Sequence, residues 1–175
     1  MQTERVRLRS WTEADREPYA ALNADPAVME HFPAPLTRQE SDAQAARIEA
    51  HLTQHGFGFW ALEVQGSFVG FVGLAHVPFE ASFTPALEIG WRLARAAWGH
   101  GYASEAARLA LAYAFEQLRV PRVVSYTATQ NLRSRAVMER LGMRYLHDFD
   151  HPRLPEGHRV RRHALYAIEN LAEPR

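Results

Sequence analysis

Apolar and polar residues alternate in short runs along this chain, and longer runs with helical spacing lie between them. Alternation is typical of half-buried strands, whereas apolar residues three and four apart are typical of amphipathic helices. Strands are therefore expected over residues 5–9, 57–64, 68–77, 86–93, 121–129, 143–149 and 160–169. This order of elements predicts an α/β (α+β) fold with a twisted, mixed but mostly antiparallel sheet flanked by helices, and one strand–helix–strand crossover.

Polar caps mark the starts of the expected helices. Thr37 and Glu40 form a capping-box pattern, and Thr12 with Asp15 repeats it earlier in the chain. Asp25-Pro26 is interpreted as another start, because aspartate is a favoured N-cap and proline suits the first helical turn. Helices are expected over residues 12–23, from 25 onward, 37–55, 102–118 and 131–141, with a loop over 32–36 and Gly142 as the C-cap of the last helix.

The composition fits one soluble domain covering residues 1–175. Of the 175 residues 47% are hydrophobic, which is enough for a sizeable core. Lys plus Arg and Asp plus Glu both number 20, so bulk charge favours neither nucleic acid nor membrane as a partner. No apolar run approaches the roughly 18 residues needed to span a bilayer. We therefore expect a cytoplasmic protein and leave a homodimer open as its assembly.

The chain contains no cysteine, which excludes a thiolate nucleophile, an enzyme-bound thioester and a thiolate metal site. His51 and His55 lie four residues apart on an expected helix, but the segment lacks the glutamate of a zinc-protease helix. No metal is therefore expected. His147 and His151 are placed in an exposed polar loop beside two aspartates.

A glycine-rich turn opens into an alanine-rich helix at residues 98–106. Gly99 and Gly101 can adopt backbone angles that other residues avoid, and the helix start presents unpaired N–H groups and a positive dipole end to an anion. A dinucleotide-binding fold requires a third glycine where Ser104 stands, and a nucleoside-triphosphate loop requires Gly-Lys-Ser/Thr. The turn therefore predicts a phosphate site, but one that suits neither NAD nor ATP.

The turn resembles the pyrophosphate loop of the GNAT superfamily of acyl-CoA-dependent N-acetyltransferases, whose pattern is Arg/Gln-x-x-Gly-x-Gly/Ala. Gly101 and Ala103 match the last two fixed positions, whereas Trp98 replaces Arg or Gln. Because main-chain amides make the phosphate contacts in such loops, we expect little loss of binding. The resemblance covers nearly the whole chain and is strongest to the ribosomal-protein-alanine acetyltransferase (RimJ/RimL) branch. Further matching segments are Leu8-Arg9 with Asp15, Asp25–Met29, Glu88–Trp91 and Asn131–Gly142.

The resemblance implies that acetyl-CoA lies across a cleft between two splayed central strands. Its pyrophosphate would contact the glycine turn, and its pantetheine arm would contact the backbone of the preceding strand. Asn131 and Ser134 would complete the site, although Asn131 is also a favoured N-cap. The implied cofactor-binding residues are Ile89, Gly90, Trp91, Leu93, Trp98, Gly99, His100, Gly101, Tyr102, Ala103, Ser104, Asn131 and Ser134.

Glu88 is the candidate general base, because it stands on an otherwise apolar strand where burial would raise its pKa. A structural carboxylate, paired with an arginine or a helix end, is the alternative interpretation. Water relayed from a backbone carbonyl, or His76, are the other candidates for the base. Backbone amides near Ile89 and Gly90 are candidates for stabilising the negative charge on the carbonyl oxygen.

Ser134 is the candidate acid for the departing thiolate. Many superfamily members carry a tyrosine four residues later, where this chain has Met138, and the branch that it resembles uses a serine at the Ser134 position. A thiol has an ordinary pKa of about 8.5, so a hydrogen bond is sufficient help for its thiolate to leave near neutral pH.

The expected reaction is direct transfer of an acetyl group to a primary amine, either a protein N-terminus or a small amine, in a ternary complex. The acceptor is expected to contact Glu30, His31 and Phe32, with His76 as a further candidate, and the irregular segment over 150–157. A non-catalytic acyl-CoA-binding or regulatory module is the rival interpretation, motivated by Met138. A phosphate-binding domain unrelated to CoA is the third.

Overall fold

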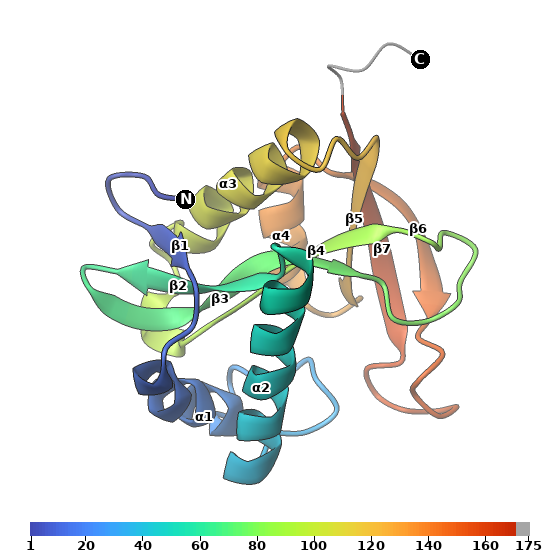
Figure 1. Cartoon of the computed structure of the whole chain (residues 1–175). Helices are drawn as coiled ribbons and strands as arrows, with labels where there is room; N and C mark the ends of the chain where they lie inside the picture. Colours follow the sequence, from blue (N-terminus) through green and yellow to red (C-terminus); the bar gives the residue numbers. More distant parts are fainter. Residues whose placement is uncertain (171–175) are drawn as a thin grey trace.

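The computed structural model describes residues 1–170 and contains a seven-stranded sheet with the order β1-β2-β3-β4-β5-β7-β6 (Figure 1). Neighbouring strands are antiparallel except for β4 and β5, which are parallel. The strands are β1 (Arg7–Arg9), β2 (Phe59–Val64), β3 (Ser67–His76), β4 (Leu87–Leu93), β5 (Arg122–Ala128), β6 (Arg144–Asp150) and β7 (Arg162–Glu169). The mixed, mostly antiparallel sheet expected from the sequence is confirmed.

The helices cover both faces of this sheet. They are η1 (Glu13–Asp15), α1 (Arg16–Ala24), α2 (Arg38–His55), η2 (Arg95–Ala97), α3 (Tyr102–Glu116) and α4 (Leu132–Arg140), where η marks a 3-10 turn. Neighbouring strand residues point to opposite faces, as at Ala61 and Leu62, and each face has its own apolar cluster. One cluster joins the sheet to α3 and α4, and the other joins it to α1 and α2.

Small residues bring α3 close to the sheet. Ala106, Ala107, Ala110 and Ala114 are each 0% exposed, and they lie in the same apolar cluster as the inner residues of β2, β3 and β4. An alanine stripe lets a helix backbone approach a sheet more closely than larger side chains would. The close packing fixes the start of α3, which carries the glycine turn, against the end of β4.

The strands β4 and β5 separate soon after they begin to pair. Their parallel register covers only Leu87 with Val123 and Glu88 with Val124, although both strands continue for several residues. Beyond this point the Ser125 hydroxyl donates a hydrogen bond to the Ile89 carbonyl at 2.9 Å. In Figure 1 the strands β5, β7 and β6 diverge from β4 as a second half of the sheet. The splayed central strands implied by the resemblance are therefore present.

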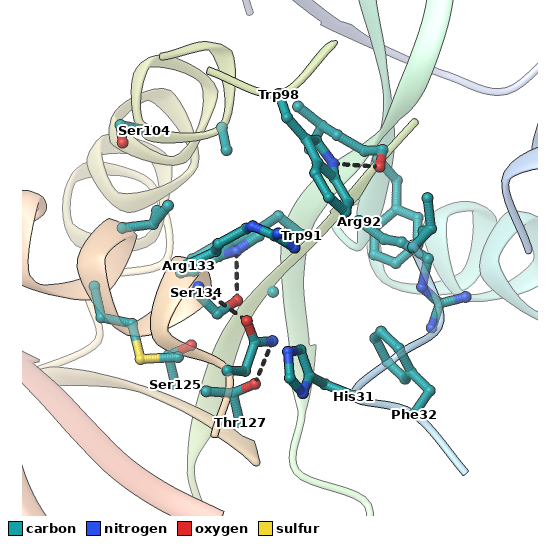
Figure 2. Close-up of a pocket in the computed structure, with 18 of the residues that line it drawn as sticks. His31, Phe32, Trp91, Arg92, Trp98, Ser104, Ser125, Thr127, Arg133 and Ser134 are labelled. Atoms are coloured by element: carbon teal, nitrogen blue, oxygen red, sulfur yellow. Dashed lines mark hydrogen bonds between the residues drawn. The ribbon is translucent and has the colours of Figure 1, made fainter. Parts of the chain in front are cut away.

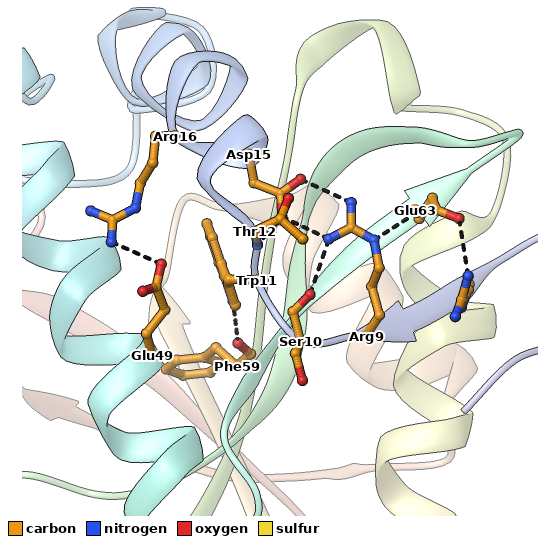
Figure 3. Close-up of polar contacts among 10 residues, drawn as sticks. Arg9, Ser10, Trp11, Thr12, Asp15, Arg16, Glu49, Phe59 and Glu63 are labelled. Atoms are coloured by element: carbon orange, nitrogen blue, oxygen red, sulfur yellow. Dashed lines mark hydrogen bonds and ion pairs between the residues drawn. The ribbon is translucent and has the colours of Figure 1, made fainter.

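A partly buried ion pair joins β1 to the turn that precedes α1 (Figure 3). Arg9 makes a two-pronged contact with Asp15, with Nη1–Oδ2 at 2.6 Å and Nη2–Oδ1 at 2.8 Å. The Arg9 Nε also donates to Glu63 of β2 at 2.6 Å. Asp15 accepts from the Thr12 backbone at 2.8 Å, which completes the capping box that the sequence predicts at this position. The pair therefore fixes where the chain enters α1 relative to the edge of the sheet.

Two local predictions are wrong. No helix begins at Asp25-Pro26: the Asp25 side chain accepts from the Ala27 backbone at 2.8 Å, and a single turn follows before the chain continues irregularly to α2. Pro33 and Pro35 lack the N–H groups that a longer helix needs. His147, placed in an exposed loop, is exposed but belongs to β6, which pairs with β7 and confirms the strand expected over 143–149.

Candidate active site

The divergence of β4 and β5 opens a pocket of about 1560 Å³. The pocket extends from the glycine turn at the start of α3, past the gap between the two strands, to α2 and the segment around Phe32. Figure 2 shows residues from both ends of this space. The pocket therefore connects a phosphate-type site to a second compartment on the side of α1 and α2.

The glycine turn has the backbone expected of an anion site. Gly99 and Gly101 both have φ of +81°, a left-handed conformation that favours glycine, and Gly101 is the N-cap of α3. The hydroxyl oxygen of Ser104 is buried at the pocket and has no hydrogen-bond partner within residues 1–170. Arg108, Arg133 and Arg140 of the pocket add positive charge, whereas Arg5 is paired with Glu105. These groups fit the pyrophosphate end of acetyl-CoA.

Trp98, the departure from the family pattern, has a structural role. Its indole Nε1 donates to the Leu93 carbonyl at 2.9 Å, so it ties the glycine turn to the end of β4. The Arg133 guanidinium lies 4.7 Å from the Trp98 ring centroid. The indole therefore takes a position where the family pattern has Arg or Gln, while the backbone of the turn remains free for a ligand.

The β4 backbone is open to the gap. Because the Ile89 carbonyl accepts from Ser125 of β5, Ile89 directs its backbone groups toward the gap. Alternate residues of a strand direct their backbone N–H and C=O groups to the same side of the strand. The N–H and C=O of Trp91 therefore face the part of the gap where β5 has diverged. An extended, amide-containing arm such as pantetheine fits this edge as an additional strand would.

A chain of hydrogen bonds fixes the start of α4 beside β4 (Figure 2). The indole Nε1 of Trp91 donates to the Ser134 Oγ at 3.0 Å. Asn131 accepts from the Ser134 backbone at 3.2 Å as the N-cap, and its Nδ2 donates to the Thr127 Oγ1 at 2.9 Å. Since the Ser134 oxygen accepts from Trp91, its own hydroxyl hydrogen is left to donate into the pocket.

Glu88 lies where the two strands separate. It lines the pocket, and burial raises its pKa to about 7, while a polar interaction with the Tyr126 hydroxyl acts in the opposite direction. Burial, together with the neighbouring carboxylate, raises the pKa of Tyr126 as well, so the phenol stays protonated. A carboxyl group with a pKa near neutral is suited to accept a proton at physiological pH.

Most of the residues implied for the site line one pocket, but three do not. Glu88, His31 and Phe32 line it. All of the implied cofactor-binding residues line it as well, except Ile89. The Ile89 side chain is 1% exposed within the core. Glu30 lies outside the lining and approaches His31 and Arg133. His76 is exposed and lies beside His55 and Phe57, so it is not brought to the pocket.

The sequence reasoning missed several pocket residues, among them Tyr126, His151, His163 and Arg92. Tyr126 faces Glu88, and His151 and His163 lie with Tyr126 in an aromatic cluster, with 5.0 Å between the two imidazole centroids. Burial lowers the pKa of His151 to about 4, so this ring is half-buried and neutral rather than part of an exposed loop. Arg92 is 8% exposed on the side of α1 and α2. The sequence carries a signal for Arg92, because Arg92, like Glu88, is a charged residue on an otherwise apolar strand.

The described residues offer no cluster of three or more His, Cys, Asp or Glu side chains that could hold a metal ion. The imidazole centroids of His51 and His55 lie 4.4 Å apart, away from the pocket lining. Within residues 1–170 no helix is both long enough and apolar enough to cross a bilayer.

Three features of the pocket fit an acyltransferase of the coenzyme A-dependent class. They are a helix start suited to a diphosphate, a strand edge suited to an amide arm, and a carboxyl group at the end of the gap. The chain belongs to the GNAT acetyltransferase family, since the family model described as Acetyltransferase (GNAT) domain matches residues 5–144. This family consists of acetyltransferases, and its members use acetyl-CoA as the acetyl donor.

Known proteins agree with this assignment. The chain is 36% identical over 156 residues to the FsC-acetyl coenzyme A-N(2)-transacetylase of Aspergillus fumigatus, covering 85% of this chain and 66% of that protein. It therefore spans just under two thirds of the relative's length. An acetyltransferase from Agrobacterium tumefaciens has a TM-score of 0.78 at 29% identity, covering 97% of this chain and 93% of the other. Mycobacterium smegmatis RimJ, in complex with CoA-disulfide, shares the fold with a TM-score of 0.75 at 22% identity, covering 97% and 84%.

Proposed function

We propose that this chain, as a single catalytic domain over residues 1–175, transfers the acetyl group of acetyl-CoA directly to a primary amine in a ternary complex. Glu88 serves as the general base and Ser134 assists the departing thiolate. The observation that carries the proposal is the position of Glu88, a pocket carboxyl group with a pKa raised to about 7, where β4 and β5 separate.

Glu88 accepts the proton that the amine loses when its nitrogen attacks the thioester carbonyl. An α-amine with a pKa near 8 is about 1.4 kcal/mol from its neutral form at pH 7, and a lysine side chain with a pKa near 10.4 is about 4.6 kcal/mol away. A carboxylate base of moderate strength is better matched to the first. The acceptor is therefore proposed to be a protein N-terminus or a small amine with a similar pKa.

Ser134 acts when the carbon–sulfur bond breaks. The Trp91 N–H donated to its oxygen makes the hydroxyl a better hydrogen-bond donor, and its hydrogen is directed to the pocket. A hydrogen bond to the thiolate then stabilises the leaving group. The free thiol forms when that thiolate takes up a proton from the pocket or from water.

The relatives support a nitrogen acceptor. The Aspergillus protein is named as an N(2)-transacetylase, which supports a nitrogen acceptor. Both the protein N-terminus and the small amine remain proposals for this chain. A homodimer is the assembly to be checked by light scattering.

Release of free thiol from acetyl-CoA, measured with a panel of amines and peptides, tests the proposal. We expect thiol release that depends on the amine and is lost in Glu88→Gln, while acetyl-CoA binding persists. Saturable acetyl-CoA binding without turnover of any amine would favour the non-catalytic module. Absence of a thermal shift with acetyl-CoA would contradict both.

A further inference from the structure

A buried guanidinium lies in the second compartment of the pocket. Arg92 of β4 is 8% exposed, and its carbon Cζ lies 4.1 Å from the ring centroid of Phe32. Its Nη1 donates to the Asn23 Oδ1 at 2.7 Å and to the Gln44 Oε1 at 3.1 Å. These acceptors are neutral amides, so they satisfy two donors without neutralising the charge.

The remaining edge of this guanidinium is unused. The Arg92 Nε is buried and without a hydrogen-bond partner, and its Nη2 makes no hydrogen bond or ion pair to any described residue. A buried charge is costly unless it is paired, and a planar guanidinium fork matches a carboxylate. Since Arg92 also lines the pocket, its missing partner can come from a bound ligand.

Glu88, Gly90 and Arg92 lie on the same face of β4, because they are alternate residues of one strand. The Cα atoms of Glu88 and Arg92 are separated by roughly 13 Å along the strand. Between them, the Phe59 ring covers Gly90 so closely that an added Cβ would lie 3.2 Å from it. One face of β4 thus presents a proton acceptor, an apolar floor and a cation in sequence.

We infer that the amine acceptor carries a carboxylate, that this carboxylate binds to Arg92, and that a short apolar segment of the acceptor lies over Gly90 and Phe59. The inference rests on the proposed function, because it names the chemical class of the acceptor. Amine and carboxylate are several bonds apart in such a molecule, as in a dipeptide or an amino acid with an acidic side chain. Arg92 is thereby a specificity-determining residue.

The charge of the pocket supports an acidic acceptor over a polycation. Within the described lining the carboxylates are Glu88 and Glu105, and Glu105 contacts Arg5 and Thr3 at the start of α3. On the acceptor side Glu88 is therefore accompanied by Arg92 and Arg153. A polyamine would place its additional cations beside these arginines, where like charges repel.

The test compares amines with and without a carboxylate at matched length. Thiol release is measured with four acid–amide pairs: β-alanine, 5-aminopentanoate, glycylglycine and glutamate, each against its amide. In at least one pair we expect the acid to have a kcat/KM about 10-fold or more above the amide. Glutamate and glycylglycine distinguish a free amino acid from a peptide as the source of the carboxylate.

Arg92→Met is expected to abolish this preference through the KM of the acid, so that kcat/KM falls about 10-fold more for the acid than for the amide. Arg92→Lys is expected to restore part of it, since the charge remains but the fork is lost. Arg122→Met, which removes an exposed arginine of β5, serves as the charge control. The acetyl-CoA dissociation constant and the melting temperature report whether each variant is folded.

Three results would overturn the inference. They are acid-to-amide ratios of kcat/KM near one in every wild-type pair, an equal loss of kcat/KM for acid and amide in Arg92→Met, or a higher kcat/KM for a polyamine than for any acid.

Binding of the N-acetylated acids and amides, measured by calorimetry, provides a readout that does not need turnover. If no amine is turned over but the acids bind more tightly than the amides in wild type alone, the proposed transfer fails while the carboxylate site stands. Equal binding of acids and amides contradicts the site itself.

Discussion

The indole Nε1 of Trp91 donates a hydrogen bond to the Oγ of Ser134 at 3.0 Å, and this contact joins β4 to α4 across the pocket. It determines which way the serine hydroxyl can donate. Ser134→Ala is expected to lower kcat about 10-fold or more with little change in the KM for acetyl-CoA, because a hydrogen bond to a developing thiolate is lost. Steady-state kinetics on the best amine of the panel measures this.

Trp91→Phe should have a smaller effect, because it removes the N–H that orients the serine, along with part of the ring, but keeps the serine hydroxyl. We expect kcat to fall several-fold, by the loss of about one neutral hydrogen bond. Trp60→Phe is the matched control: Trp60 is a buried β2 tryptophan that packs against Tyr113 and lies outside the pocket lining. Equal kcat losses in the two tryptophan variants would contradict an orienting role for Trp91.

Gly101→Val is expected to weaken acetyl-CoA binding at least about 10-fold. A β-branched residue at φ of +81° is strained by on the order of 2 kcal/mol and pulls the turn out of its anion-binding conformation. The fold should survive, since an added Cβ meets only the Arg5 guanidinium, at 3.8 Å. Gly66→Val, with similar strain in the β2–β3 hairpin at φ of +78°, is the control. Unchanged affinity in Gly101→Val, measured by calorimetry, would refute the assignment of the turn.

The Arg9–Asp15 pair should make stability dependent on acidic pH. Burial alone would raise the pKa of Asp15, but hydrogen bonds from Arg9 and Thr12 hold it below the ordinary value of 3.8. The stabilisation is therefore fully present above that value and is lost as pH falls through the lower folded pKa. Asp15→Asn is expected to cost about 1–3 kcal/mol at pH 7, because Arg9 loses one charged partner and keeps only Glu63.

Urea unfolding at pH 7 and at pH 3 measures this effect. The exposed pair of Glu17 with Arg38 provides the control, since Glu17→Gln removes a surface ion pair that solvent screens and that contributes little to stability. Asp15→Asn should unfold with less dependence on acidic pH than the wild type. A loss no larger than that of the surface control would argue against the pair as a structural lock.

Glu88 should affect stability in the opposite direction. Its pKa is raised by burial from 4.5 to about 7, so its protonated form favours the folded state; that stability is fully present below 4.5 and is lost as pH rises from there to about 7. Glu88→Gln imitates the protonated form. It is expected to be more stable than wild type at pH 8, by on the order of 2 kcal/mol, and nearly equal to it at pH 5. Thermal melts across this range would detect a variant that is instead less stable at pH 8.

The sequence predicted the parts of the site that are local in the chain. The glycine turn, the Asn131 cap and the Glu88 strand are each visible in a few consecutive residues, so turn chemistry and alternation identify them. Contacts between distant segments were not visible. Tyr126 reaches Glu88 only because β4 and β5 are neighbours in the sheet, and Arg92 meets Asn23 and Gln44 only because α1 and α2 cover that face.

Two expectations failed for related reasons. Asp25-Pro26 has the local chemistry of a helix start, but two later prolines end the segment after one turn. His76 occupies an end of β3 whose distance from the pocket depends on strand register, which alternation alone does not determine. Local patterns predict elements, whereas the packing of elements decides which side chains share a site.

The most direct test is the ratio of wild-type to Glu88→Gln kcat/KM on one amine, measured from pH 5.5 to 8.5. Taking the ratio cancels the ionisation of the amine, which is common to both enzymes. We predict a ratio that rises with pH through an apparent pKa near 7 to about 100 or more, the usual contribution of a general base. A ratio near one that does not vary with pH would contradict the account.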